Sequence, residues 1–272
     1  MSYAAIITHV QADPAAAHRL DCAIDLARRF DATLIGIGVE LVPLFSGLYG
    51  VTGEWTVTFR EAVEARIKDA GTRFRAATVA SHPPAVWLQC LDEPTTALAK
   101  ASLAADLIVA GGAPARKHDA YRDVSSAVLA ITAGRPVLVV PPQPRRLRAQ
   151  NIVLAWKDTR EARRAMSDAL PLLQRADQVL VTEVCHYDEA EHATRGVGEV
   201  VAALERHGVK ARPRVVQKRG PTGFDLLEEA RQIDADLIVS GAYGHSRLNE
   251  WSFGGFTDDL LSQNEVFLLL SH

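Results

Sequence analysis

The feature that most restricts the fold is an internal repeat of short apolar runs. The pentapeptide ADLIV occupies residues 105–109 and returns unchanged at residues 235–239. A second apolar run, residues 137–140, has the same offset of 130 residues (236 − 106 and 267 − 137) to residues 267–270. Short runs that are almost wholly apolar are typical of strands buried on both faces. The chain is therefore predicted to contain two copies of one structural unit.

Between these runs, strand patterns alternate with helix patterns. Strands are expected at residues 3–10, 32–39, 86–91, 106–110, 137–140, 152–155, 179–184, 210–217, 237–239 and 266–270. Helices are expected at residues 15–30, 56–79, 95–104, 160–174, 189–207, 224–233 and after residue 256. Such alternation predicts an α/β fold with parallel, doubly wound sheets and right-handed crossovers. We expect two tandem domains, residues 1–144 and 150–272, joined by a linker rich in proline and arginine.

Glycines mark a loop after the second copy of ADLIV. Gly241 and Gly244 follow the buried strand, and Gly254 and Gly255 precede the last helical pattern. Glycine permits positive φ angles and lets a ligand approach the backbone closely. A helix N-terminus offers unpaired N–H groups and a partial positive charge. The arrangement predicts an anion site, and phosphate is the commonest biological anion at such sites.

The glycine spacing resembles the nucleotide-loop signature of the universal stress protein family. Two residues separate Gly241 from Gly244, and nine separate Gly244 from Gly254. Gly255 departs from the family, which usually has Ser or Thr there. The two copies resemble the tandem members of that family over nearly the whole chain. The resemblance implies five strands per domain in the order 3-2-1-4-5, pairing of the last strands of the two domains, and a ligand crevice between strands 1 and 4.

The ligand that the resemblance implies is an adenine nucleotide, ATP with or without Mg²⁺. Residues expected at the second-domain site are Ala155, Trp156, Lys157, Gly241, Gly244, Arg247, Gly254, Gly255, Phe256 and Thr257. Backbone N–H groups of residues 254–257 would hold the phosphates. Because Gly255 lacks the usual hydroxyl, weak binding is expected, with slow or absent hydrolysis. No catalytic residue is assigned.

Three of these side chains have two interpretations. Lys157 replaces the acidic residue usual in the family and either meets a phosphate or faces water. Trp156 either covers a nucleobase or packs in the core, and Arg247 either contacts a phosphate or is a solvated loop residue. The alternative function is a stress protein that binds another small molecule or a protein through its crevice and its apolar loop.

The first domain lacks the glycine signature. Gly111 and Gly112 are followed by alanine and proline, and Val124 and Ser125 stand at the offset of 130 from Gly254 and Gly255. We expect this domain to have lost the nucleotide site. Its apolar loop, residues 41–55, either packs over the adjacent helix or contacts a partner. Because apolar patches often mark contacts, a homodimer is expected.

Composition and charge restrict the other possibilities. Hydrophobic residues make up 48% and charged residues 23% of the 272 residues, as in globular proteins, and the net charge is −3. The basic residues at 145–148 are interpreted as a solvated linker, without a nucleic-acid partner. No apolar stretch reaches the length of a membrane span, and the N-terminus reads as a strand. The three widely scattered cysteines do not suggest a disulfide framework, so we expect a cytoplasmic protein. Cys185, His186 and His192 lack the spacing of a metal site.

Overall fold

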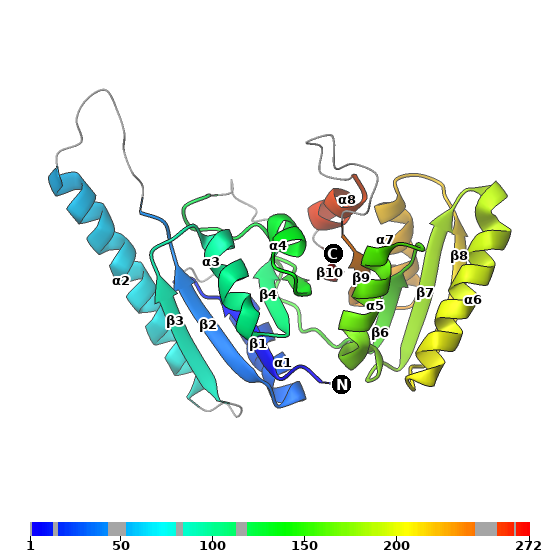
Figure 1. Cartoon of the computed structure of the whole chain (residues 1–272), viewed down its shortest axis with the longest axis horizontal. Helices are drawn as coiled ribbons and strands as arrows, with labels where there is room; N and C mark the ends of the chain where they lie inside the picture. The colour runs from blue at the N-terminus through cyan, green and yellow to red at the C-terminus, as the bar shows by residue number, and fades with distance from the viewer. Residues whose placement is uncertain are drawn as a thin grey trace, which may run out of the picture.

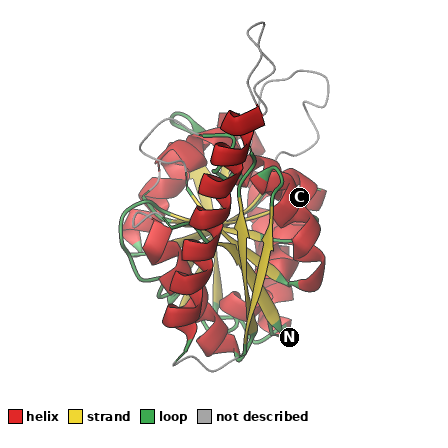
Figure 2. Cartoon of the chain, turned by 90° about the vertical axis from the view of Figure 1, so that its left-hand side faces the viewer, coloured by secondary structure: helices red, strands yellow, loops and turns green. Residues whose placement is uncertain are grey.

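The computed structural model describes residues 2–12, 16–42, 53–79, 84–112, 119–242, 255–263 and 265–272. They form one ten-stranded sheet with helices on both faces (Figures 1 and 2). The strand order is β3-β2-β1-β4-β5-β10-β9-β6-β7-β8. Within each half this is the order 3-2-1-4-5, and the halves join through their last strands. The α/β class, the strand order and the tandem arrangement were therefore predicted correctly.

The elements fall close to the expected ranges. In the first half they are β1 (Ala5–His9), α1 (Ala17–Phe30), β2 (Thr33–Val39), α2 (Gly53–Thr78), β3 (Ala85–Cys90), α3 (Pro94–Ala101), the 3₁₀ turn η2 (Ser102–Ala104), β4 (Leu107–Gly111), α4 (Ser126–Thr132) and β5 (Val137–Val140). In the second half they are β6 (Asn151–Ala155), α5 (Arg160–Leu173), β7 (Gln178–Cys185), the 3₁₀ turn η3 (Tyr187–Glu189), α6 (Ala190–Arg206), β8 (Ala211–Gln217), α7 (Thr222–Gln232), β9 (Leu237–Gly241), α8 (Gly255–Gln263) and β10 (Phe267–Ser271).

Strands β5 and β10 join the two halves. They pair antiparallel, with Leu138 opposite Leu269 and Val139 opposite Leu268. The other neighbouring strands in the sheet pair parallel. The four residues of β5 and the five of β10 are all buried. Left unpaired, each strand would be an exposed apolar edge, which is prone to aggregation. The predicted pairing of these two runs is confirmed.

The core has two layers, one on each face of the sheet. Along β4, Leu107 and Val109 belong to one buried cluster, and Ile108 belongs to the other. Each cluster continues across the β5–β10 pair: Leu269 lies in the first and Leu268 in the second. Because side chains alternate along a strand, a strand covered on both faces needs apolar residues at every position. This explains the unbroken apolar runs of the repeat.

Two local assignments need correction. Helix α4 was not predicted, because its seven residues are too few to show a helical period; Ser125 caps it by accepting a hydrogen bond from the amide of Val128 at 3.3 Å. Helix α2 begins at Gly53, so the last residues of the expected apolar loop are helical. The remainder of that loop, residues 43–52, lies outside the described residues.

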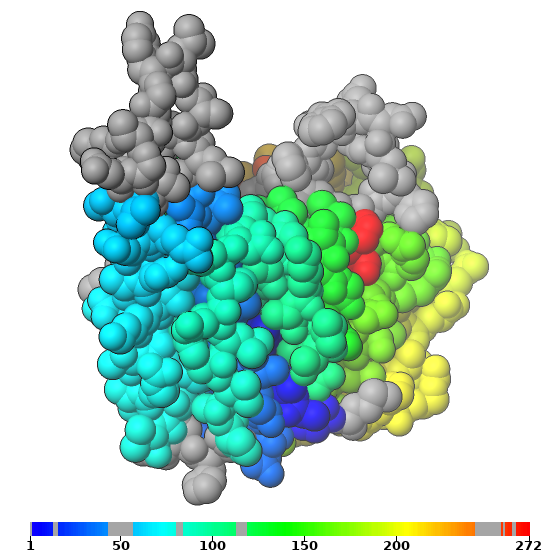
Figure 3. Space-filling model, turned by 60° about the vertical axis from the view of Figure 1, so that its left-hand side comes forward, coloured from blue at the N-terminus to red at the C-terminus, as the bar shows by residue number. Residues whose placement is uncertain are grey.

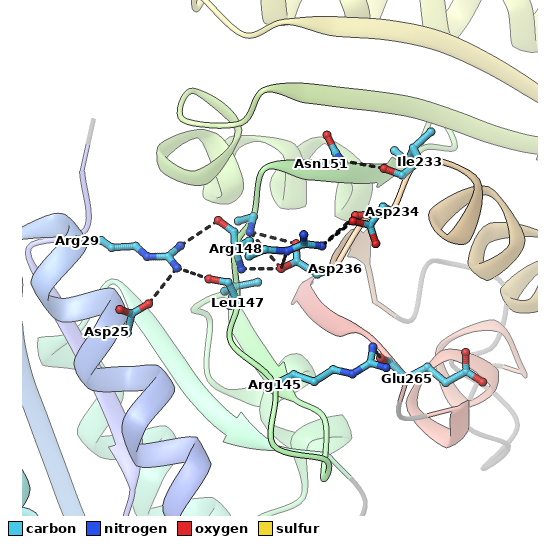
Figure 4. Close-up of polar contacts among 11 residues, drawn as sticks. Asp25, Arg29, Arg145, Leu147, Arg148, Asn151, Ile233, Asp234, Asp236 and Glu265 are labelled. Carbon is cyan, nitrogen blue, oxygen red and sulfur yellow. Dashed lines mark hydrogen bonds and ion pairs between the residues drawn. The ribbon is translucent and has the colours of Figure 1, made fainter.

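The linker is bonded to both halves (Figure 4). Its buried residue Leu147 and its neighbour Arg148 accept hydrogen bonds through their carbonyls from Arg29 of α1. The other linker contacts, donor first, are Arg145 to the Glu265 carbonyl at 2.9 Å, Arg146 to Asp25 at 3.1 Å, and Arg148 to Asp234 at 3.0 Å. The three arginine side chains are exposed, as expected of a solvated linker. Their hydrogen bonds to both halves of the chain were not predicted.

The aspartate of ADLIV has the same role in both copies. The carboxylate of Asp236 accepts hydrogen bonds from the amides of residues 148 and 149 at 2.5 and 3.0 Å. The carboxylate of Asp106 accepts from the amides of residues 4 and 5 at 2.7 and 3.1 Å. In each half the aspartate thus fixes the chain as it enters, or is about to enter, the first strand. Within the described residues, no helix combines the length and the apolar character needed to cross a membrane.

Candidate functional site

The candidate site lies where β6 and β9 meet. Strand β6 pairs with β7 on one side and with β9 on the other. In the β6–β9 pair, Ile152 lies opposite Leu237 and Leu154 lies opposite Val239. The carboxyl ends of these two parallel strands are Ala155 and Gly241. Ligands of open α/β sheets bind beyond the carboxyl ends of strands at such a switch point. The structure therefore brings together the two segments expected to form the site.

Gly241 touches the first turn of α5. A Cβ atom at this position would lie 2.6 Å from the amide nitrogen of Ala162 and 2.7 Å from the carbonyl carbon of Glu161. Helix α5 begins after Thr159, whose hydroxyl accepts a hydrogen bond from the Ala162 amide at 3.2 Å. Close packing of the helix on the strand is enough to require glycine at 241. This requirement is independent of any ligand.

The end of β6 supplies one buried and one exposed side chain. Trp156 is 8% exposed, lies in the same core cluster as Ala162, and donates its amide hydrogen to the carbonyl of Thr182 at 2.8 Å. Its burial agrees with core packing, the second of its two interpretations. Lys157, the next residue, is exposed. Ala155 is buried at the end of the strand.

Glu183 places an acidic group near this lysine. It follows Thr182, the residue of β7 that lies opposite Ala155 of β6. Burial raises the pKa of the Glu183 carboxyl, and the charges of Lys157 and His192 oppose that shift. No sequence pattern marks Glu183 as a site residue, because only the β6–β7 register shows that it lies beside the end of β6. The acidic residue that the family usually has near position 157 is replaced by lysine here. Glu183 of the neighbouring strand β7 places a carboxyl group close to that position.

Helix α8 and the end of β9 complete the described part of the site. Thr257, in the first turn of α8, is 2% exposed. After β9, Ala242 donates its amide hydrogen to the carbonyl of Ser271 at 2.8 Å, and His272 donates to the carbonyl of Ala242 at 2.9 Å. Gly255 is the first residue of α8. The expected site residues Gly244, Arg247 and Gly254 and the side chain of Phe256 lie outside what the structure describes.

The equivalent place in the first half is occupied by an arginine of α1. A Cβ atom at Gly111, the end of β4, would lie 2.9 Å from Nη1 of Arg19. Arg19 donates to the carbonyl of His9 at 3.1 Å and to the side-chain oxygen of Gln11 at 3.2 Å, and Gln11 donates to the carbonyl of Arg122 at 2.8 Å. This hydrogen-bonded set of side chains lies at the carboxyl ends of β1 and β4. No pattern in the sequence indicates that Arg19 reaches this end of the sheet.

No metal centre is recognised at either of these strand ends in the part of the chain that the structure describes. There, no group of three or more His, Cys, Asp or Glu side chains is placed to hold an ion. Cys22, Cys90 and Cys185 are free thiols.

The comparisons with known proteins agree with the topology. Residues 148–270 match the model of the universal stress protein family. Among curated protein sequences, none matches the chain. A solved universal stress protein from Archaeoglobus fulgidus DSM 4304 is 12% identical, covers 98% of this chain and 95% of that chain, and has a TM-score of 0.67. A functionally unknown protein from Pseudomonas aeruginosa PAO1 is 14% identical, with coverages of 99% and 92% and a TM-score of 0.61.

At these identities the two solved structures show a shared fold along the whole chain, and the family model identifies the second half. Residues 148–270 therefore match the universal stress protein family, and the whole chain shares the fold of these two solved proteins.

Proposed function

We propose that the second half of the chain binds an adenine nucleotide, ATP first, and that the protein is a cytoplasmic stress-response regulator controlled by that ligand. The observation that carries the proposal is the position of the glycine signature. It follows β9 at the β6–β9 switch point and leads into α8, which begins at Gly255. Phosphates are recognised at such strand-to-helix connections by backbone N–H groups and the helix dipole.

Phosphate binding would rest mainly on the backbone of α8. The amides of residues 255–257 have no partner within the helix, as in any first turn. Gly255 keeps its N–H and loses only the hydroxyl that Ser or Thr would add. A hydrogen bond to a charged group contributes about 1.5–3 kcal/mol, so affinity falls by roughly ten- to a hundredfold. Exposed Lys157 at the end of β6 is the described side chain best placed to recover part of this loss.

The first half would not bind the nucleotide. At its switch point Arg19 holds the space beside Gly111, and its hydrogen bonds to His9 and Gln11 keep it there. A phosphate that took this space would have to displace the guanidinium from its hydrogen-bond partners His9 and Gln11. We therefore assign this half, residues 1–144, a structural and interaction role, and the nucleotide site to residues 150–272.

Two further properties belong to the same proposal. The protein associates as a homodimer, because exposed apolar side chains such as Val86 and Leu88 gather on the first half. Hydrolysis of ATP is slow or absent, since no nucleophile with a placed base is recognised at the end of β6 or β9 in the described residues. The nucleotide would then act as a signal rather than as a substrate.

A second candidate, a family member that binds no nucleotide, is favoured by Gly241. Its lack of a side chain is explained by the contact with Glu161 and Ala162 alone. In that case the crevice binds another small molecule or a protein.

Calorimetric titration of the full chain with ATP, ADP and AMP separates the two candidates. We expect saturable heat with ATP, loss of that heat in Gly244→Trp, and unchanged heat in Gly112→Ala of the first half. Because a ligand of the native state raises stability by RT ln(1 + [L]/Kd), thermal shifts should follow the same ranking. No heat and no shift at millimolar ATP would leave the non-nucleotide candidate.

A further inference from the structure

The two ends of the ten-stranded sheet are protected differently. Strand β8 ends the sheet on one side and has the sequence ARPRVVQ; β3 ends it on the other and has the sequence AVWLQC. In β8, Pro213 removes a hydrogen-bond donor, and Arg214 is held by Glu229 of α7 at 2.8 Å. Proline and charge are the usual means by which edge strands avoid pairing with other chains. Strand β3 has neither.

Strand β3 also exposes an apolar face. Trp87 packs under α2, with its ring 5.4 Å from that of Phe74. The neighbouring residues on the other face, Val86 and Leu88, are 44% and 39% exposed. Alternation along the strand puts exposed Cys90 on the same face. Among the described residues no strand pairs with the outer side of β3, so a free backbone ladder and an apolar strip lie together at this edge.

Helix α2 runs beside this edge (Figures 2 and 3). It is coloured cyan in Figure 3. Its residues 61, 64, 68, 71 and 75 follow at spacings of three and four, so they form one stripe. Gly71 places that stripe on the β3 side, because a Cβ there would lie 2.9 Å from the Trp87 indole. On the opposite flank Arg66 turns inward and pairs with Glu40 at 2.7 Å.

Charges along the stripe are divided by sign. Glu61 and Glu64 lie in its N-terminal half, where Glu64 also pairs with Arg60 at 2.8 Å, and Lys68 and Arg75 lie in its C-terminal half; all four stripe residues are exposed. A parallel strand–helix–strand unit runs its helix antiparallel to its strands. Two copies joined by antiparallel β3 strands would therefore also set their α2 helices antiparallel. The acidic half of each stripe would then face the basic half of the other.

We propose that two copies of the chain associate through β3 across a two-fold axis, which continues the sheet from one copy into the next. The contact combines the free backbone ladder of β3, the apolar strip of Val86 and Leu88, and the charge stripe of α2. Each of these is complementary to itself under a two-fold rotation, so a second copy is the partner that fits. The inference rests on the proposed homodimer and is independent of nucleotide binding.

The first experiment measures mass in solution by sedimentation equilibrium over micromolar concentrations. The wild type is expected to be a dimer. Leu88→Lys should weaken it on the order of a hundredfold, because a lysine would be buried without a partner. Phe224→Lys is the matched control, since Phe224 is an apolar residue of α7 that is 49% exposed and lies in the other half. It should leave the mass unchanged, and thermal melting confirms that both variants are folded.

The second experiment exchanges charges. Glu61→Lys with Glu64→Lys makes the stripe basic throughout, and Lys68→Glu with Arg75→Glu makes it acidic throughout. Each double variant alone should be mainly monomeric, and an equimolar mixture should form a mixed dimer. A wild type that stays monomeric would overturn both the proposed homodimer and the proposed β3 interface. It would leave the proposal of nucleotide binding unaffected. A dimer that persists in Leu88→Lys would keep the homodimer and overturn the β3 surface.

Discussion

Asp106 and Asp236 hold equivalent places in the two copies of ADLIV. Each carboxylate accepts two backbone N–H groups of the segment that leads into the first strand of its half. The repeat in the sequence showed that an aspartate recurs, but its partners lie about a hundred residues away in the chain. A functional carboxylate and a structural one look alike in such a sequence. Here the contacts assign the structural role.

Asp236→Ala should destabilise the protein by about 1.5–3 kcal/mol, because the amides of residues 148 and 149 lose a charged acceptor. Asp234→Ala is the control: Asp234 pairs with Arg148 at 3.0 Å, but its side chain is 81% exposed, so less than about 1 kcal/mol should be lost. Chemical denaturation of both variants measures the difference. Equal losses would contradict the assigned role of Asp236.

His9 is a buried base at the end of β1. It is 2% exposed, and its Nε2 lies 3.1 Å from the carbonyl of Val39. Burial lowers the pKa of His9 from 6.5 to about 3, and the charge of Arg19 acts in the same direction. Between these two pH values the unfolded chain binds a proton that the folded chain does not. Stability therefore falls as the pH decreases through this window, and His9 has no effect above it.

His9→Gln should make the stability of the protein less sensitive to acid. Removal of one such group lowers the slope of unfolding free energy against pH by about 1.4 kcal/mol per pH unit near pH 5. Denaturation midpoints of wild type and variant between pH 7 and pH 4 measure the slope. Parallel curves for the two proteins would show that His9 becomes protonated without unfolding.

The packing of α5 on β9 illustrates what local patterns can and cannot predict. A helix that begins at residue 160 and a strand that begins at residue 237 were both expected from the sequence, and both are present. Their contact was not expected, because glycine after a strand was interpreted through ligand approach alone. Helix α4 was missed for a different reason: seven residues give no period, and only Ser125 as a cap could have indicated it.

Gly241→Ala should destabilise the protein by about 1–3 kcal/mol, since its Cβ would meet backbone atoms of α5 that cannot move singly. Gly220→Ala is a matched control, because no heavy atom lies within 4 Å of the Cβ position there. Its change should stay within about 0.5 kcal/mol. Thermal unfolding without ligand compares the two variants. A neutral Gly241→Ala would show that the helix does not constrain this position.

The assembly of the two halves was more predictable than the contents of their crevices. Two apolar runs at equal places in a repeat indicated sheet edges that had to be covered, and β5 pairs with β10 as expected. The filling of the first crevice depends on Arg19, a residue of an amphipathic helix with no distinguishing pattern. The role of the linker depends on Arg29 and Asp236, which are near it only in space. Side-chain contacts between distant segments leave no periodic trace in a sequence.

Amide NMR spectra of the full chain during titration with ATP show whether a nucleotide binds at the end of β9 and not at the end of β4. We predict saturable shifts of the amide resonances of Lys157, Gly241, Ala242 and Gly255, with those of Gly111 and Gly112 unchanged. Resonances that do not shift at millimolar ATP, or that shift first at Gly111 and Gly112, would contradict binding at the end of β9.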